Sequence, residues 1–178
     1  MKKLIAIMLM FLPMLVWGQK ITRHEVDKFT KQCVIETSSE KIADFNKWKS
    51  LIPDPSEVVV SIRNVDGAWI MPASIRLDET QKYTNEDGIT LLLENDATIV
   101  LKTLYTGIGA ESVGLSKNRH AFNTAFELTN EDVDNLRTNK ITAVRVSYLG
   151  GHKDFECDKS KGEKVKKMIK LIDDALSK

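Results

Sequence analysis

The chain has few cysteines, no excess of charge of one sign and, after its first residues, no long hydrophobic run. Cys33 and Cys157 are its only cysteines, and 178 residues are enough to bury a core without depending on crosslinks. Lysine and arginine number 26 against 25 aspartate and glutamate residues, so no bulk electrostatic attraction draws the chain to nucleic acid. No repeat, low-complexity tract or Pro- or Ser-rich linker divides the sequence, which favours a single domain.

The first residues have the pattern of a cleaved secretory signal. Lys2 and Lys3 precede an apolar run, residues 4–16, and Val16 and Gly18 occupy the minus-three and minus-one positions of a cut before Gln19. The run is shorter than the roughly 20 apolar residues that span a membrane. No cysteine lies at the cut, so a lipoprotein anchor is not supported. We therefore expect residues 1–18 to be removed and residues 19–178 to act in the periplasm or as a secreted protein, without stable membrane insertion.

Turn residues between runs rich in β-branched residues predict hairpins. Asp66-Gly67, Asn95-Asp96 and Gly150-Gly151 each separate two strand-like runs. Dipeptides of this kind suit two-residue hairpin turns because Gly, Asn and Asp tolerate positive φ. Counting outward from Gly150-Gly151 places Arg145 opposite Glu156. The same register gives one apolar face, formed by Val144, Val146, Phe155 and Cys157.

An earlier run, residues 27–37, alternates in the same way and predicts a strand with Phe29, Cys33 and Ile35 on one face. Both cysteines then point inward. A Cys33–Cys157 disulfide is feasible if the first and last strands are neighbours, and two buried free thiols are the alternative.

The clearest helix spans about residues 160–177. Ser160 and Glu163 have the spacing of a capping box. An apolar stripe with helical spacing follows, formed by Val165, Met168, Ile169, Ile172, Ala175 and Leu176. A lysine-rich helix can lie on an anionic membrane, but packing of the stripe against a sheet explains the same pattern. A second helical or irregular piece is predicted for residues 39–51, where Ile42, Phe45 and Trp48 recur every three residues.

The acidic stretch "ELTNEDVDNL", residues 127–136, raises the question of a metal or acid/base site. Thr129 followed by Asp132 has the spacing of a helix N-cap, and acids suit the positive end of a helix. In a calcium loop that starts at Asp132, the sixth position would require glycine, and Arg137 stands there. We therefore interpret the stretch as the start of a short helix with Val133 and Leu136 on its buried face.

Other residue types do not form a known chemical motif. His24, His120 and His152 are isolated, which argues against a zinc site. The glycines of "GIGAESVG" lack the spacing of a nucleotide-binding loop, and Ser112 lacks the flanks of a nucleophile elbow. We predict no catalytic residue, no metal site and no cofactor.

Two ligand-binding patterns remain. Tyr105 and His120 flank a glycine-containing loop with Gly107 and Gly109, and these four residues are the candidate small-molecule site. Aromatic side chains that share an exposed face could instead stack on sugar rings. The candidates are Trp48, Trp69, Tyr83, Tyr105 and Tyr148.

The segments "HEVDKFTKQCVIETSSEKI", "FELTNEDVDNLRTNKITAVRV" and "DFECDKSKGEKVKKMIKLI" resemble a group of uncharacterised exported β-rich proteins of Gram-negative bacteria. In this group a strand, an "LT-x-E-D" turn, a hairpin and a terminal helix follow in that order. The resemblance covers about half of residues 19–178 and implies the architecture and the compartment. It implies no activity, cofactor or catalytic residue.

These observations predict a mainly β or α+β fold, an antiparallel sandwich-like or curved sheet of roughly seven or eight strands with a C-terminal amphipathic helix. The function we expect is that of an exported non-catalytic binding module whose partner is an envelope protein, a peptide or a glycan. A periplasmic domain that binds a small molecule or a glycan is the alternative. A hydrolase of the cell envelope would need acids or histidines from distant strands to converge, and is the third hypothesis.

Overall fold

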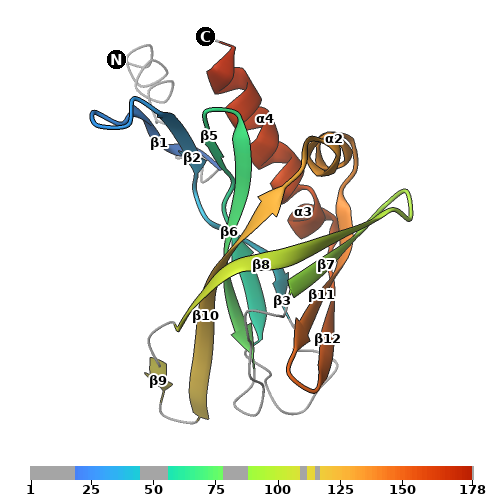
Figure 1. Cartoon of the computed structure of the whole chain (residues 1–178). Coiled ribbons are helices and arrows are strands. Elements are labelled where there is room, and N and C mark those ends of the chain that lie inside the picture. The colour runs from blue at the N-terminus through green and yellow to red at the C-terminus, as the bar shows by residue number, and fades with distance from the viewer. Residues whose placement is uncertain (1–18, 45–55, 78–87, 109–111, 115–116, 178) are drawn as a thin grey trace, which may run out of the picture.

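A computed structural model describes residues 19–44, 56–77, 88–108, 112–114 and 117–177 (Figure 1). Within these ranges the chain is mainly β, an open antiparallel sheet with a C-terminal helix, which confirms the predicted fold class. The described strands number twelve, more than the seven or eight expected. The strands are β1 (Ile21–Val26), β2 (Cys33–Thr37), β3 (Glu40–Asp44), β4 (Glu57–Val60), β5 (Arg63–Val65), β6 (Ala68–Leu77), β7 (Gly88–Leu93), β8 (Thr98–Ile108), β9 (Ser112–Gly114), β10 (Lys117–Leu128), β11 (Ile141–Tyr148) and β12 (Gly151–Glu156). The helices are α2 (Asn130–Thr138), α3 (Lys159–Gly162) and α4 (Lys164–Leu176).

The sheet follows the order β1-β2-β5-β6-β10-β8-β7-β11-β12. β4 pairs with β6 beside β5, and β3 pairs with β4. Between β4 and β5 the chain bends at Ser61 and Ile62, where the Thr37 hydroxyl accepts a hydrogen bond from the Ile62 N–H at 3.0 Å. This bend sends β5 to β2 and β4 to β3, so the sheet curves strongly (Figure 1).

One face of the curved sheet forms the core together with α4. Alternate residues of β6 and β7 are fully buried, as a half-buried antiparallel sheet requires. Four stripe residues of α4 join them, namely Val165, Met168, Ile169 and Ile172. The packing interpretation of the C-terminal helix is therefore confirmed, although Leu176 at its end is 50% exposed.

The start of the C-terminal helix differs from the prediction. Asp158, not Ser160, is the N-cap, and its carboxylate accepts a hydrogen bond from the Lys161 N–H at 2.9 Å. The helix is divided at Glu163 into α3 and α4, and Glu163 makes no side-chain cap. Asp158 takes the role because its backbone is extended and it directly precedes the first residue of α3, as an N-cap requires.

The three predicted hairpins form at the expected places, and the turns of the second and third differ from those predicted. Asp66-Gly67 is a two-residue turn with both residues at positive φ, as predicted. At the second hairpin Leu93 and Ala97 are hydrogen-bonded, so the loop has three residues and Asp96 takes the positive φ. Three-residue loops of this kind end in a left-handed residue, which Asp tolerates.

The predicted register of the third hairpin is wrong. Tyr148 pairs with Gly151, so Leu149 and Gly150 form the turn and Arg145 faces Asp154 rather than Glu156. Gly150 has φ of +92° and Gly151 begins the strand. The register differs by two residues, and a shift of two leaves each side chain on its own face. Val144, Val146 and Phe155 are therefore buried as predicted.

The predicted strand over residues 27–37 is also wrong in its first half. Residues 27–32 form the turn between β1 and β2, and the Phe29 side chain is 94% exposed. The Asp27 carboxylate accepts hydrogen bonds from the N–H groups of Phe29 and Thr30, and this turn replaces the extended backbone that the alternation suggested. Of the second helical or irregular piece predicted for residues 39–51, residues 40–44 form β3, and residues 45–51 lie outside the described residues.

Candidate functional site

A hollow of about 570 Å³ lies on the sheet, and its lining residues other than the core residues Val144 and Phe155 are half-buried or exposed, on the face that points away from the core. We call it the β11 hollow, because β11 runs through its middle. Its described lining consists of Asp44, Thr90, Leu92, Thr98, Ala143, Val144, Arg145, Asp154, Phe155 and Glu156. β7, β8, β11 and β12 supply all of these residues except Asp44, which is the last residue of β3.

Strand pairing arranges seven of the ten described lining residues of the β11 hollow in two rows. Thr90, Arg145 and Asp154 face one another across β7, β11 and β12. The second row consists of Thr98, Leu92, Ala143 and Glu156. Side chains opposite each other in adjacent strands share a face, so each row lies on one face of the sheet. Leu92 and Ala143 make the centre of the second row apolar, and Asp154 and Glu156 make the β12 end of the two rows charged.

The Arg145 guanidinium and the Asp154 carboxylate form a two-pronged ion pair at the charged end. The Nε–Oδ1 and Nη2–Oδ2 distances are both 2.7 Å, and the side chains are 50% and 53% exposed. The hydrogen bonds from Arg145 lower the pKa of Asp154, and the same bonds raise the pKa of Arg145. Both groups therefore stay charged at neutral pH, which suits hydrogen bonding to a ligand better than proton transfer.

Asp44 borders the β11 hollow and is held by a lysine. The Lys161 Nζ lies 2.7 Å from Asp44 Oδ1 and 3.1 Å from Asp158 Oδ2. The hydrogen bond to Asp44 is the main reason that the pKa of Lys161 is raised. This contact ties α3 to β3 beside the hollow.

The four candidate ligand residues are not all described. Tyr105 and Gly107 lie in β8, opposite Ala125 and Asn123 of β10. His120 lies further along β10, opposite Leu77 of β6, and Gly109 is outside the described residues. The backbone thus brings Tyr105 and His120 onto neighbouring strands, and their joint role in binding stays a prediction.

The acidic stretch that follows β10 is a helix start, as predicted. The Thr129 hydroxyl accepts a hydrogen bond from the Asp132 N–H at 3.1 Å, and the Asp132 carboxylate accepts one from the Thr129 N–H at 2.9 Å. Val133 and Leu136 are buried. The carboxylate of Asp132 is therefore used in a capping box.

The three histidines lie on different strands, His24 on β1, His120 on β10 and His152 on β12, and Tyr148 packs half-buried against the core. No group of three or more His, Cys, Asp or Glu side chains among the described residues could hold a metal ion. Trp69 is 6% exposed and belongs to the core, with the Arg137 guanidinium 5.6 Å from its ring centre. Trp48 and Tyr83 lie outside the described residues.

The two cysteines are free thiols in the structure. Cys33 begins β2, and Cys157 directly follows β12. These strands are not neighbours in the order of the sheet, so the condition for the Cys33–Cys157 disulfide is not met.

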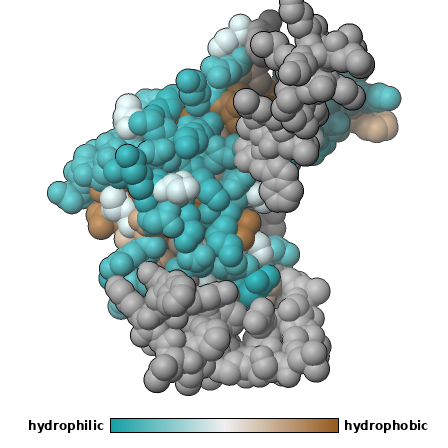
Figure 2. Space-filling view, turned by 180° about the vertical axis from the view of Figure 1, so that it is seen from behind, coloured by the Kyte–Doolittle hydropathy of each residue, from teal (hydrophilic) through white to brown (hydrophobic). Residues whose placement is uncertain are grey.

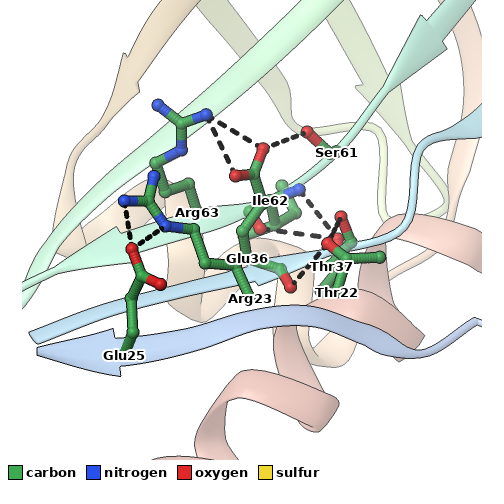
Figure 3. A network of polar contacts seen from close by, with 8 residues as sticks. All are labelled: Thr22, Arg23, Glu25, Glu36, Thr37, Ser61, Ile62 and Arg63. Atoms are coloured by element: carbon green, nitrogen blue, oxygen red, sulfur yellow. Dashed lines mark hydrogen bonds and ion pairs between the residues drawn. The ribbon is translucent and has the colours of Figure 1, made fainter.

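A second polar cluster lies on β1, β2 and β5 (Figure 3). The Arg63 Nη2 donates to both carboxylate oxygens of Glu36 at 3.0 Å, and Arg23 pairs with Glu25. Arg63 and Glu36 face each other across β5 and β2, and cross-strand pairs of this kind stabilise a sheet face, whereas Arg23 and Glu25 are two residues apart on β1. We interpret the cluster as structural.

Comparison with known proteins adds no relative. No family model matches the chain, and no curated protein or solved structure matches it at a significant level. The resemblance to exported proteins of Gram-negative bacteria therefore stays a prediction. Among the described residues, no helix is long and apolar enough to cross a membrane.

Proposed function

We propose that the chain is an exported, non-catalytic binding module and that its ligand occupies the β11 hollow. The N-terminal pattern of Lys2, Lys3 and the following apolar run supports export. The observation that carries the binding role is the hollow itself, about 570 Å³ in volume, with an apolar centre and a charged end. Ligand sites commonly measure roughly 300–1,000 Å³ and combine apolar lining with a few placed polar groups.

The lining favours a small ligand that has an apolar body and a polar end. Leu92 and Ala143 would contact the apolar part, and the Arg145–Asp154 pair offers both donors and acceptors to the polar part. The one aromatic residue of the described lining, Phe155, is only 2% exposed. The hollow therefore supports a metabolite or a short peptide better than a glycan, because sugar rings are usually held by exposed aromatic faces.

The state of two charged groups of the lining supports the non-catalytic part of the proposal. Asp154 is held ionised by Arg145, and Asp44 is paired with Lys161. General acid/base catalysis needs a group that changes its protonation near the working pH. A lowered pKa moves Asp154 away from that range.

The test is a thermal-unfolding screen of the purified chain against panels of metabolites, short peptides and glycans. A ligand at about 100 times its dissociation constant adds roughly 2.7 kcal/mol, which raises the melting temperature by several degrees for a chain of this size. Any hit is then tested on Ala143→Phe, which fills the centre of the hollow. Ser74→Phe is the matched control, because Ser74 is a partly exposed residue of β6, in another part of the sheet.

We expect Ala143→Phe to lose the stabilisation by the ligand and Ser74→Phe to keep it. A ligand that stabilises both variants as much as the wild type would bind elsewhere and would contradict the assignment of the hollow. A flat response to all small-ligand panels, with known binders responding in parallel, would also contradict it.

A further inference from the structure

The turn between β1 and β2 is tightly built although it lies at the edge of the molecule (Figure 1). We call residues 26–32 the β1–β2 tip. The Asp27 carboxylate accepts hydrogen bonds from the N–H groups of Phe29 at 2.9 Å and Thr30 at 2.7 Å. The Asp27 N–H donates to the Gln32 carbonyl, and the Lys31 N–H donates to the Asp27 carbonyl, both at 2.8 Å. The tip is thus fixed by its own backbone and not by packing on the core.

The β1–β2 tip exposes apolar side chains between basic ones. Phe29 is 94% exposed and Val26 is 58% exposed. Lys28 and Lys31 are exposed on either side of Phe29, and neither forms an ion pair with a described residue. In Figure 2 the tip projects at the upper right, with a hydrophobic spot beside hydrophilic residues.

The one carboxylate of the β1–β2 tip, Asp27, stands against two lysines, so the tip keeps a net charge of +1. Asp27 is oriented by its two hydrogen bonds to backbone N–H groups, and these bonds lower its pKa. Its Oδ1 therefore accepts hydrogen bonds inside the turn, while Lys28 and Lys31 are exposed to solvent. An exposed aromatic ring with a lysine on each side has the chemistry that binds a membrane interface: the ring enters the boundary between headgroups and acyl chains, and the lysines contact anionic headgroups.

We propose that the β1–β2 tip docks the protein on the surface of an anionic phospholipid bilayer. A bilayer fits this tip better than a folded protein partner does. A stable protein interface buries roughly 800 Å² on each side, whereas one aromatic side chain buries about 150–250 Å². The rest of β1 presents polar residues, Arg23, His24 and Glu25, on both sides of an exposed strand. A bilayer needs no shape-complementary surface, so a single convex tip is sufficient for reversible binding.

The experiment measures partition of the protein into vesicles. The chain is purified after export by an expressing host, and vesicles of phosphatidylcholine alone are compared with vesicles that also contain phosphatidylglycerol. The variants are Phe29→Ala and the double substitution Lys28→Gln with Lys31→Gln. Leu149→Ala is the matched control, because Leu149 is 66% exposed at the β11–β12 turn, a different hairpin tip. All variants share the same N-terminal residues, so differences between them report on the substituted positions.

We expect binding to the anionic vesicles and little binding to phosphatidylcholine alone. Phe29→Ala should weaken partition about tenfold or more, and each lysine replaced should weaken it roughly fivefold and reduce its salt dependence. Leu149→Ala should bind as the wild type does. Equal partition of Phe29→Ala and the wild type, absence of binding to anionic vesicles, or binding that ignores lipid charge would each overturn the proposal.

Discussion

Arg145 and Asp154 face each other across the β11–β12 hairpin and are joined by two hydrogen bonds of 2.7 Å. The sequence alone suggested Glu156 as the partner of Arg145. Both acids lie on the same face of β12, so alternation could not distinguish them. The choice is made by the turn, which uses Leu149-Gly150 and leaves Gly151 to the strand.

A double-mutant cycle separates the two registers. Arg145→Ala and Asp154→Ala should show a small favourable coupling in the free energy of unfolding, because the pair is close but exposed. The coupling should decrease at high salt. The same cycle with Glu156→Ala is the matched control and should give a smaller coupling with Arg145. A larger coupling to Glu156 than to Asp154 would support the register predicted from the sequence and contradict the structure.

The cap of α2 gives a second prediction. Thr129→Ala removes the hydroxyl that accepts a hydrogen bond from the Asp132 N–H, and should cost about 1 kcal/mol of stability. For a chain of this size the melting temperature should fall by roughly 2–4 °C. Thr129→Ser keeps the hydroxyl and should remain close to the wild type. If both variants lose the same stability, the hydroxyl does not act as the cap.

The parts of the fold that local residues determine could be predicted from the sequence. Asp66 and Gly67 both adopt positive φ and form the expected two-residue turn. Thr129 and Asp132 form a capping box at the expected helix start. The alternation of buried residues also holds where the hairpin register does not. Phe29 was misassigned because its spacing from Cys33 and Ile35 fits a strand, while the turn depends on the hydrogen bonds of Asp27.

The β11 hollow could not be predicted in the same way. Asp44 and Glu156 are far apart in the sequence and both line the hollow because the sheet curves and brings β3 near β12. Strand order decides this arrangement, and no local pattern specifies strand order. The alternation did place Arg145 on the outer face, which was the one available signal of the site.

Gly162 provides a third prediction, on the contact between α3 and β11. A Cβ at Gly162 would lie 2.1 Å from the carbonyl oxygen of Ile141, a backbone atom that cannot move without shifting β11. Gly162→Ala should therefore destabilise the protein by about 1–3 kcal/mol or more, measured by denaturant unfolding. The control is Gly151→Ala, whose Cβ would meet the Tyr148 side chain at an ordinary 3.5 Å. Equal stability of the two variants would contradict the close approach of α3 to β11.

Cys157 is a half-buried thiol whose ionisation opposes folding. Burial raises its pKa to about 12, although Lys161 acts in the opposite direction. At pH 8 the folded protein should therefore react slowly with an alkylating reagent at Cys157, and the unfolded chain should react quickly. Thiol titration of the unfolded chain without reductant should find two free thiols, and a result of none would show that Cys33 and Cys157 are bonded.

The same thiol predicts a loss of stability at alkaline pH. An ordinary cysteine ionises near pH 9, so between about pH 9 and 12 the unfolded state releases a proton that the folded state retains. The stability due to Cys157 is thus fully present below pH 9 and decreases as the pH rises, by up to about 1.4 kcal/mol for each pH unit. Urea unfolding of the wild type and of Cys157→Ala at several values from pH 8 to pH 10.5 measures this contribution, because every other titrating group is common to both. As the pH rises, the free energy of unfolding of the wild type should fall relative to that of Cys157→Ala. If the two free energies change in parallel, the Cys157 thiol is not desolvated in the folded protein.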